Sequence, residues 1–366
     1  MIKVPYTNFK KQWIDEKKFI LKIISDVYKK GQFVSEEEVK KFEVNLAKFC
    51  GVRYAVGLNS GTDALTLGLL LLGIRKGDEV ITPPNSFISS TSCITHIGAK
   101  PVFVDVLDDQ NINPYLIEKS ITKKTKAIMA VHLTGRIANM EKINQISKKY
   151  KIPIIEDAAQ SIGSKFNRKL AGSFGTVGCF SCHPLKNLNA SGDSGFLTTN
   201  NFKLYKQALN LRNNGIENRN VIRNFGYLSR MDVLQSKILN FRLKKLNGII
   251  KKRRKHAETY FNNLDRKKIK IVFEKKSEFN TYHTFIIHSK KRDKLKKYLL
   301  KNGIETAIHY PVPIHLQPAA KSLNYKLGDF PITEKQSKEI LTLPINQYLN
   351  KKDILYVCKM INKFND

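Results

Sequence analysis

One lysine stands where a buried strand is expected to end and a loop to begin. Residues 177–181 form a short apolar run, and Lys186 follows in a segment that is broken by Pro184 and rich in Asn, Ser and Gly. Small residues of this kind let the backbone pass close to a bound group. Most lysines lie on the surface in water, so this position is what distinguishes Lys186. We interpret it as a lysine that forms a Schiff base with a carbonyl group.

A carboxylate is expected at the same edge of the fold. Residues 153–157 have the pattern of a buried strand, and they end in Glu156 and Asp157. Parallel α/β sheets bind their ligands at the carboxyl ends of the strands. We therefore expect Asp157 to face the same site as Lys186. Without Lys186, a cap on the following helix would be the preferred role for both carboxylates.

These residue types match what pyridoxal phosphate requires of a protein. The cofactor needs an amine, an anion at its pyridine nitrogen, a phosphate site and a surface against its ring. Lys186 and Asp157 would meet the first two needs. Ser60, Gly61 and Thr62 open a predicted helix, where free N–H groups and the positive end of the dipole favour a phosphate. Further candidates are Ser181 for the phosphate or ring, Phe87 for stacking on the ring, and Gln160 for the 3′-oxygen or the substrate.

Several of these candidates also have a purely structural explanation. Helix N-caps have the same sequence with or without a ligand, and isolated aromatic residues more often belong to a core. The same two interpretations apply to residues 309–317, a Pro-bracketed loop that presents two imidazoles and a phenol. Because rigid loops often line sites, we predict substrate contacts for His309, Tyr310 and His315.

Strand-like and helical patterns alternate from residue 51 to about residue 213. This alternation predicts an α/β fold in which helices cover both faces of a mostly parallel sheet. The seven expected strands are 54–58, 79–82, 101–106, 127–131, 153–157, 177–181 and 195–198, and helices are expected at 62–72, 87–97, 115–121, 140–150 and 201–213.

The ends of the chain are predicted to be organised differently. Residues 1–50 have helical periodicity, and one long helix is expected from Met231 to Leu264. A smaller α+β part follows, with strands expected at 269–273, 281–287 and 305–309. We divide the chain into a cofactor-binding large domain, residues 1–240, and a small C-terminal domain, residues 241–366.

Composition excludes several classes of protein. The chain has 366 residues, of which 42% are hydrophobic, so it can bury a core. It contains no apolar run of roughly 20 residues and no signal-peptide pattern at its start. Five scattered cysteines suit a reducing compartment. We therefore expect a cytoplasmic protein without a membrane partner.

The formal charge of +33 has two interpretations. It could attract anionic partners such as phosphorylated substrates or nucleic acid. The densest basic run, residues 251–255, has no interleaved aromatic residues, and no nucleic-acid motif accompanies it. We favour solvated helix faces and predict no nucleic-acid partner.

The segment Cys179-x-x-Cys182-His183 matches the attachment pattern of c-type haem, and its two cysteines could also form a redox pair or half of a zinc site. Covalent haem requires an exported apoprotein, and the sequence has no second Cys pair that would complete a zinc site. Redox pairs usually open a helix rather than end a strand. We interpret the spacing as coincidence and predict no metal.

Taken together, the motifs resemble the DegT/DnrJ/EryC1/StrS sugar aminotransferases over nearly the whole chain. These pyridoxal-phosphate enzymes of fold type I, the aspartate aminotransferase-like fold, aminate keto-sugars carried on nucleoside diphosphates. The motifs that carry the resemblance are Phe42-Glu43, Asn59-Ser60-Gly61-Thr62-Asp63-Ala64-Leu65, residues 77–82 and 98–105, Val131-His132-Leu133, Glu156-Asp157-Ala158-Ala159-Gln160, Lys186-Asn187-Leu188, Leu211-Arg212-Asn213 and residues 309–317.

The resemblance implies specific roles and partners. Lys186 would be the Schiff-base lysine and Asp157 the partner of the pyridine nitrogen, and the other cofactor contacts would be Gly61, Thr62 and Ser181 at the phosphate, Phe87 on the ring and Gln160 near its oxygen. The resemblance also implies a homodimer with shared active sites, glutamate as amino donor and an amino sugar for surface polysaccharide or glycoconjugate synthesis. The loop at 309–317 favours 3-keto over 4-keto hexoses as acceptors.

The sequence departs from the family at a few positions. Leu228 stands where the family usually sends an Asn to the phosphate of the neighbouring subunit, so this contact is in doubt. Asn189 and Ser194 replace common glycines and should stiffen the loop after Lys186.

Several competing functions can be weighed against these residues. Relatives that dehydrate sugars lack the lysine, so Lys186 favours transamination. Amino-acid aminotransferases usually bind the substrate carboxylate with an arginine of the C-terminal domain. After Arg266 the only arginine is Arg292, in a charged run that is expected to be solvated, which disfavours that class. A 4-keto-sugar aminotransferase and a non-catalytic regulatory protein of the same family also stay open.

Overall fold

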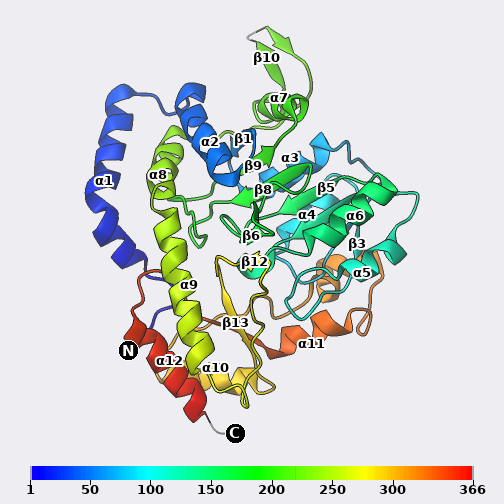
Figure 1. Ribbon diagram of the computed structural model, residues 1–366. Helices are drawn as coiled ribbons and strands as arrows, with labels where there is room; N and C mark the ends of the chain where they lie inside the picture. The colour runs from blue at the N-terminus through cyan, green and yellow to red at the C-terminus, as the bar shows by residue number, and fades with distance from the viewer. Residues whose placement is uncertain (1, 219, 365–366) are drawn as a thin grey trace.

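The computed structural model describes residues 2–218 and 220–364 (Figure 1). Its centre is a seven-stranded sheet with the order β1-β9-β8-β5-β4-β2-β3. Strands β3, β2, β4, β5 and β8 are parallel, and β9 runs antiparallel to both β8 and β1. The mostly parallel α/β architecture predicted from the sequence is confirmed. The strands are β1 Tyr54–Leu58, β2 Glu79–Thr82, β3 Lys100–Phe103, β4 Thr125–Val131, β5 Ile154–Asp157, β8 Val177–Ser181 and β9 Gly195–Thr199.

Two hydrophobic clusters cover the two faces of this sheet. Neighbouring residues of one strand belong to different clusters: on β5, Ile154 packs in one and Ile155 in the other, and on β8 the same holds for Phe180 and Cys179. This is the period of two that a strand imposes on its side chains. The helices that contribute include α2 Glu36–Cys50, α3 Gly61–Leu71, α4 Ser89–His96, α6 Met140–Tyr150 and α7 Phe202–Leu211.

The N-terminal segment lies against the C-terminal part of the chain. Val4 forms a parallel bridge with Ile304, and the backbone N–H of Tyr6 donates to Glu305 Oε2 at 2.9 Å. The predicted N-terminal helices then follow: α1 spans Phe9–Lys30 and ends at Gly31, whose φ of 62° is left-handed. Residues close to the start of the chain are therefore fixed against the C-terminal part.

The helix predicted from Met231 to Leu264 is two helices, α8 Val233–Leu243 and α9 Leu246–Asn263. They are separate because each packs on different partners: α8 lies against α1 and α2, and α9 lies against the C-terminal helix α12, Lys351–Lys363. Ile250 of α9 still belongs to the core of the large sheet, whereas Ala257 belongs to the second core. The division at residue 240 stays a prediction, and the change of core occurs within α9.

The C-terminal part has a small two-stranded antiparallel sheet, β13 Phe285–His288 and β14 Ile340–Leu343. The strands expected at 269–273 and 305–309 are each reduced to a single bridge, Lys270 with His288 and Ala307 with Thr342. The strand predicted from residue 281 begins only at Phe285, because Tyr282 has a left-handed φ of 47° that interrupts the extended backbone.

Short elements complete the chain. Residues 115–121, expected as one helix, form α5 Pro114–Ile117 followed by a turn of 3₁₀-helix at Glu118–Ser120. No helix in the described part of the chain has the length and apolar composition needed to cross a membrane. The remaining elements are β6 Lys165–Phe166, β7 Lys169–Leu170, β10 Ile216–Asn218, β11 Val221–Ile222, β12 Glu278–Phe279, α10 Arg292–Lys301 and α11 Pro331–Glu339.

Candidate active site

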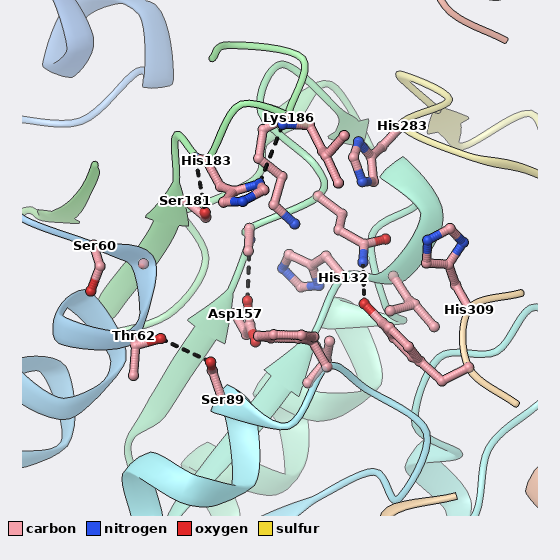
Figure 2. Close-up of a pocket in the computed structure, with 18 of the residues that line it drawn as sticks. Ser60, Thr62, Ser89, His132, Asp157, Ser181, His183, Lys186, His283 and His309 are labelled. Atoms are coloured by element: carbon pink, nitrogen blue, oxygen red, sulfur yellow. Dashed lines mark hydrogen bonds between the residues drawn. The ribbon is translucent and has the colours of Figure 1, made fainter. Parts of the chain in front are cut away.

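A cavity of about 410 Å³ lies at the carboxyl ends of β4, β5 and β8 (Figure 2). The N-termini of α3 and α4 border it, and the N-terminal segment and the C-terminal part of the chain close it. The cavity brings together every residue proposed for the site from the sequence except His315. These residues are Ser60, Gly61, Thr62, Phe87, Asp157, Gln160, Ser181, Lys186, His309 and Tyr310.

Lys186 reaches into the middle of this cavity from the loop after β8 (Figure 2). Its backbone N–H donates to His183 O at 2.8 Å, and the side-chain amide of the next residue, Asn187, donates to Thr281 O at 3.3 Å. Burial lowers the pKa of the Lys186 amine, and the nearby charge of Asp157 opposes this shift. The amine is therefore a better nucleophile and base near neutral pH than a solvated lysine.

Asp157, at the end of β5, is buried and held by two donors. The hydroxyl of Ser90 donates to its Oδ2 at 2.6 Å, and the N–H of Ala159 donates to its Oδ1 at 3.1 Å. Its neighbour Glu156 leaves the strand on the other face and accepts hydrogen bonds from the backbone N–H groups of Gly172, Phe174 and Gly175, at 2.8, 2.7 and 2.6 Å. Glu156 fixes a loop, and Asp157 lines the cavity.

The start of α3 offers an anion site. Ser60 is its N-cap, and its Oγ accepts from Asp63 N at 3.0 Å. The first two helical N–H groups, those of Gly61 and Thr62, have no acceptor among the described residues. The hydroxyls of Thr62 and Ser89 lie 2.8 Å apart, beside the cavity that Ser181 also lines (Figure 2).

The anion site depends on the close approach of the start of α3 to the end of β8. A Cβ on Gly61 would lie 2.6 Å from Ser181 Cβ, so only glycine lets the start of α3 approach the end of β8 this closely. Two free N–H groups, three hydroxyls and the helix dipole suit a phosphate dianion. These residues fit the phosphate of pyridoxal phosphate, and Lys186 and Asp157 fit its aldehyde and its pyridine nitrogen.

Phe87 and Gln160 border the space between these groups. The exposed ring of Phe87 lies 6.1 Å from the ring of Tyr310, measured between centroids. Gln160 Oε1 accepts from Thr134 N at 2.8 Å, and its Nε2 donates to the Tyr310 hydroxyl at 3.3 Å. Gln160 thus joins the large sheet to the loop at 309–317.

His309 and Tyr310 form the wall opposite the anion site. His309 Nδ1 lies 3.0 Å from Thr342 Oγ1, and the ring of Tyr6 stacks on the imidazole with centroids 6.1 Å apart. Burial lowers the pKa of His309 to about 4, and the charge of Lys186 adds to this shift. Burial, together with the charge of Asp157, raises the pKa of Tyr310. Both side chains are neutral at neutral pH.

His315 does not line the cavity, so its predicted contact with substrate is corrected. The 3₁₀ turn Ile314–Leu316 directs the His315 side chain into the protein, where it is buried against Phe330. Its Nε2 lies 3.1 Å from Glu334 Oε1, and Glu334 also accepts from the N–H groups of Gly328 and Phe330. His315 therefore belongs to a buried network that holds a loop.

Other residues noted in the sequence also lie outside the cavity lining. Leu228 is exposed. Cys179 and Cys182 are free, buried thiols, and burial raises the pKa of each. Neither thiol is set up to act as a thiolate.

Several lining residues were not proposed from the sequence, among them Tyr6, Arg253, His283 and Asn346. Asn346 fixes the N-terminal segment by donating to Pro5 O and Tyr6 O, both at 3.1 Å. His283 has a pKa that burial lowers well below the usual value, so its imidazole is neutral. No sequence signal marks Tyr6, because its contacts are with residues about 300 positions away.

The burial of Arg253, although not its place in the cavity, could have been predicted from the sequence. It lies in the basic run 251–255, which was expected to be solvated. The buried residues of α9 include Leu246, Ile250, Arg253, Ala257 and Tyr260, which recur at three or four positions along one helix face. The periodicity places Arg253 on the buried face, although its charge favours exposure.

Comparisons with known proteins agree with this geometry. The sequence profile of the DegT/DnrJ/EryC1/StrS aminotransferase family matches residues 14–362. A protein of Geobacillus stearothermophilus described as a pleiotropic regulatory protein is 37% identical, over 99% of this chain and 98% of its own. The dTDP-3-amino-3,6-dideoxy-alpha-D-galactopyranose transaminase of Aneurinibacillus thermoaerophilus is 36% identical, over 99% of both chains.

A solved structure is similar over the whole chain. The crystal structure of NtdA from Bacillus subtilis, with the bound cofactor PMP, superposes with a TM-score of 0.89 and 30% identity, covering 100% of this chain and 86% of the other. The fold and the cofactor expected from the sequence are confirmed by this likeness and by the family match.

Proposed function

Because the chain belongs to the DegT/DnrJ/EryC1/StrS aminotransferase family, we propose that it transfers the amino group of glutamate to C3 of a keto-hexose linked to a nucleoside diphosphate. The protein is a pyridoxal-phosphate enzyme of the sugar aminotransferase class. In the proposed reaction, glutamate leaves as 2-oxoglutarate, and the sugar carbonyl becomes an amine. The two half-reactions use one site in turn.

The observation that carries the proposal is the placement of Lys186 opposite Asp157 in one cavity, with an anion site at its edge. When bound there, pyridoxal phosphate supplies an aldehyde that condenses with amines and a ring that accepts electrons. The start of α3, with Thr62, Ser89 and Ser181, would hold its phosphate.

The chain's own residues would orient the reactants and move protons. The amine of Lys186, whose pKa burial lowers, can take a proton from a substrate carbon and return it elsewhere. Asp157, fixed by Ser90, would hold a positive charge at the pyridine nitrogen. Gln160 would contact the 3′-oxygen, and Phe87 would cover the ring.

Two observations support a 3-keto acceptor. The transaminase of Aneurinibacillus thermoaerophilus, 36% identical, is named for a 3-amino sugar. The family resemblance of the loop at 309–317 favours a 3-keto acceptor, and His309 and Tyr310 of this loop line the cavity. A 4-keto acceptor is the competing proposal.

The test is an assay of the purified holoenzyme with glutamate and a panel of 3-keto and 4-keto hexoses carried on dTDP, UDP or GDP. We expect 2-oxoglutarate and a 3-amino sugar in equal amounts, measured by mass spectrometry and NMR. Amination at C4 would replace the proposed regiochemistry. Reaction with none of these sugars would favour a regulatory role, as the name of the Geobacillus relative suggests for that protein.

Lys186→Ala is the control that links the reaction to the site. We expect this variant to lose multiple-turnover transamination, because no other lysine lines the cavity in the described residues. Lys206→Ala, on α7 and outside the cavity lining, is the matched surface lysine and should keep wild-type turnover. Sustained turnover by Lys186→Ala would refute the assignment.

A further inference from the structure

Arg253 brings a buried positive charge to the cavity that holds Lys186. It projects from α9, lines the cavity and is only 6% exposed. Its Nη1 donates to Tyr282 O at 3.1 Å and to His283 O at 3.2 Å, and its Nη2 donates to Gln347 Oε1 at 3.2 Å. Its Nε has no acceptor among the described residues.

Arg253 is distinctive among the buried arginines that the structure describes. There are five, and four of them pair with a carboxylate: Arg136 with Glu278, Arg212 with Glu43, Arg242 with Glu16 and Arg292 with Asp293. Arg253 donates only to neutral oxygens. Burying a charge without a counter-ion is costly, so an arginine kept in this state points to a negative group that arrives from outside.

The surroundings of Arg253 strengthen this interpretation. Burial lowers its pKa to about 10, with the phenols of Tyr6 and Tyr348 opposing the shift, so the guanidinium is charged at neutral pH. Burial lowers the pKa values of His283 and His309, so both imidazoles are neutral. The charge of Lys186 adds to both decreases, and the charge of Arg253 adds to that of His283. This side of the cavity is therefore positive, and none of the described residues pairs a carboxylate with Arg253.

Aminotransfer requires the same cavity to accept two different substrates in turn. An amino-acid donor carries at least one carboxylate, and its amine must reach the position that Lys186 occupies. Lys186, His283 and Arg253 line the same cavity, and Arg253 Nη1 donates to the backbone oxygen of His283 at 3.2 Å. A carboxylate at Arg253 would thus be near the amine that Lys186 exchanges with.

We propose that Arg253 is the residue that binds a carboxylate of the amino-acid donor in this cavity. The inference rests on the proposed aminotransferase function and adds to it how the donor is recognised. The guanidinium supplies charge-assisted hydrogen bonds through Nε and the free N–H of Nη2. In the second half-reaction the sugar nucleotide binds in place of the amino-acid donor. Its binding does not depend on the contact with Arg253.

The experiment compares the two half-reactions in single-turnover mode, from the absorbance of the bound cofactor. Wild type and Arg253→Gln are titrated first with L-glutamate, and then with the amino-sugar nucleotide in the reverse direction. We expect Arg253→Gln to raise the half-saturating glutamate concentration about 10- to 100-fold, the range for losing a hydrogen bond to a charged group. The amino-sugar half-reaction should change less than about threefold.

Two further donors separate the two carboxylates of glutamate. L-Glutamine keeps the α-carboxylate and replaces the other with an amide, and 4-aminobutyrate lacks the α-carboxylate. A penalty that is the same for glutamine and glutamate assigns Arg253 to the α-carboxylate. If Arg253→Gln raises the half-saturating concentration of 4-aminobutyrate but not that of glutamine, Arg253 binds the side-chain carboxylate. Either assignment supports the proposal.

Arg254→Gln is the matched control. Arg254 lies on the same helix and, like Arg253, donates to a backbone oxygen of residues 280–283, here Asn280 O at 2.8 Å. Unlike Arg253, it pairs with Glu274 and does not line the cavity. It should leave both half-reactions unchanged. Arg253→Lys, which keeps the charge and loses the planar fork, should restore part of the glutamate affinity.

The outcomes distinguish this inference from the proposed function. Wild type that does not react with glutamate or any other amino acid would refute the proposed function, and this inference with it. Two results with a reactive wild type would overturn the inference. In one, Arg253→Gln slows both half-reactions equally, and in the other it slows neither; in both cases Arg253 has only a structural role.

Discussion

Glu156 and Asp157 are neighbours on β5, and their side chains leave the strand on opposite faces. The first accepts three backbone N–H groups of a buried loop, and the second receives the Ser90 hydroxyl and lines the cavity. At this scale, one step along a strand decides whether a carboxylate stabilises the fold or serves the site. The chemistry of the side chain is the same in both cases.

Asp157→Asn tests the role of this carboxylate. We expect a loss of turnover of at least about 100-fold, because a fixed negative charge at a site of developing charge contributes this much in enzymes. Binding of the cofactor should persist, measured by its absorbance after gel filtration. Unchanged turnover would remove Asp157 from the proposed role.

Ser90→Ala provides a graded comparison. Ser90 donates to Asp157 Oδ2, so its removal should weaken the positioning of the carboxylate and keep its charge. We expect a loss of turnover that is clearly smaller than that of Asp157→Asn. Turnover is measured at saturating glutamate and sugar.

At the scale of elements, the site depends on how closely α3 approaches the end of β8. The contact between Gly61 and Ser181 sets this distance, and an added Cβ would need to displace the strand or the helix. We predict that Gly61→Ala weakens cofactor binding by about tenfold or more, since the helix N–H groups would move away from the phosphate. The affinity is measured by titrating apoenzyme with pyridoxal phosphate.

Gly248→Ala is the control for this prediction. Gly248 lies inside α9, where an added Cβ would meet no atom within 4 Å. Because alanine is a better helix former than glycine, this variant should keep the cofactor affinity and melt at the same temperature or higher. Equal cofactor affinity in Gly61→Ala and wild type would contradict the proposed phosphate site.

At the scale of the whole molecule, buried neutral histidines link stability to pH. Burial lowers the pKa of His288 to about 4, and the charge of Lys270 contributes. The unfolded chain has an ordinary histidine pKa near 6.5, so between these values it binds a proton that the folded protein does not. Stability therefore falls as pH falls through this window, by about 2 kcal/mol at pH 5 for one such histidine.

His288→Gln checks this dependence away from the active site. The free energy of unfolding, from urea titrations at pH 7 and pH 5, should decrease less in this variant than in wild type. The exposed His96 is the matched control, and His96→Gln should follow the wild type. Identical decreases in His288→Gln and wild type would contradict the assignment.

The resemblance also predicts a homodimer. The described surface carries exposed apolar side chains on α1, among them Trp13 and Ile14, and on the hairpin segment near β11, among them Ile222, Phe225 and Leu228. Such side chains are typical of interfaces. Light scattering should give twice the chain mass of 41.9 kDa. Phe225→Ser should shift the protein toward monomer. The control Tyr115→Ser, at an exposed residue of α5, should leave the dimer unchanged. A wild type that stays monomeric would refute the prediction.

The sequence by itself determined the elements of the sheet and which residues lie at the edge where the cavity is found. Lys186, Asp157 and the Ser60-Gly61-Thr62 turn could be predicted because strand ends, helix starts and turn residues are local patterns. Their meeting followed from one rule, that parallel strands present their carboxyl ends at one edge.

Only the tertiary structure decided which distant side chains complete or leave the site. Tyr6 joins it through contacts with residues about 300 positions away, and His315 leaves it because one 3₁₀ turn directs the ring to Glu334. Arg253 joins it because α9 passes from one core to the other, which buries a residue whose charge predicted exposure. Local sequence determines the face of an element, but packing between elements determines what that face meets.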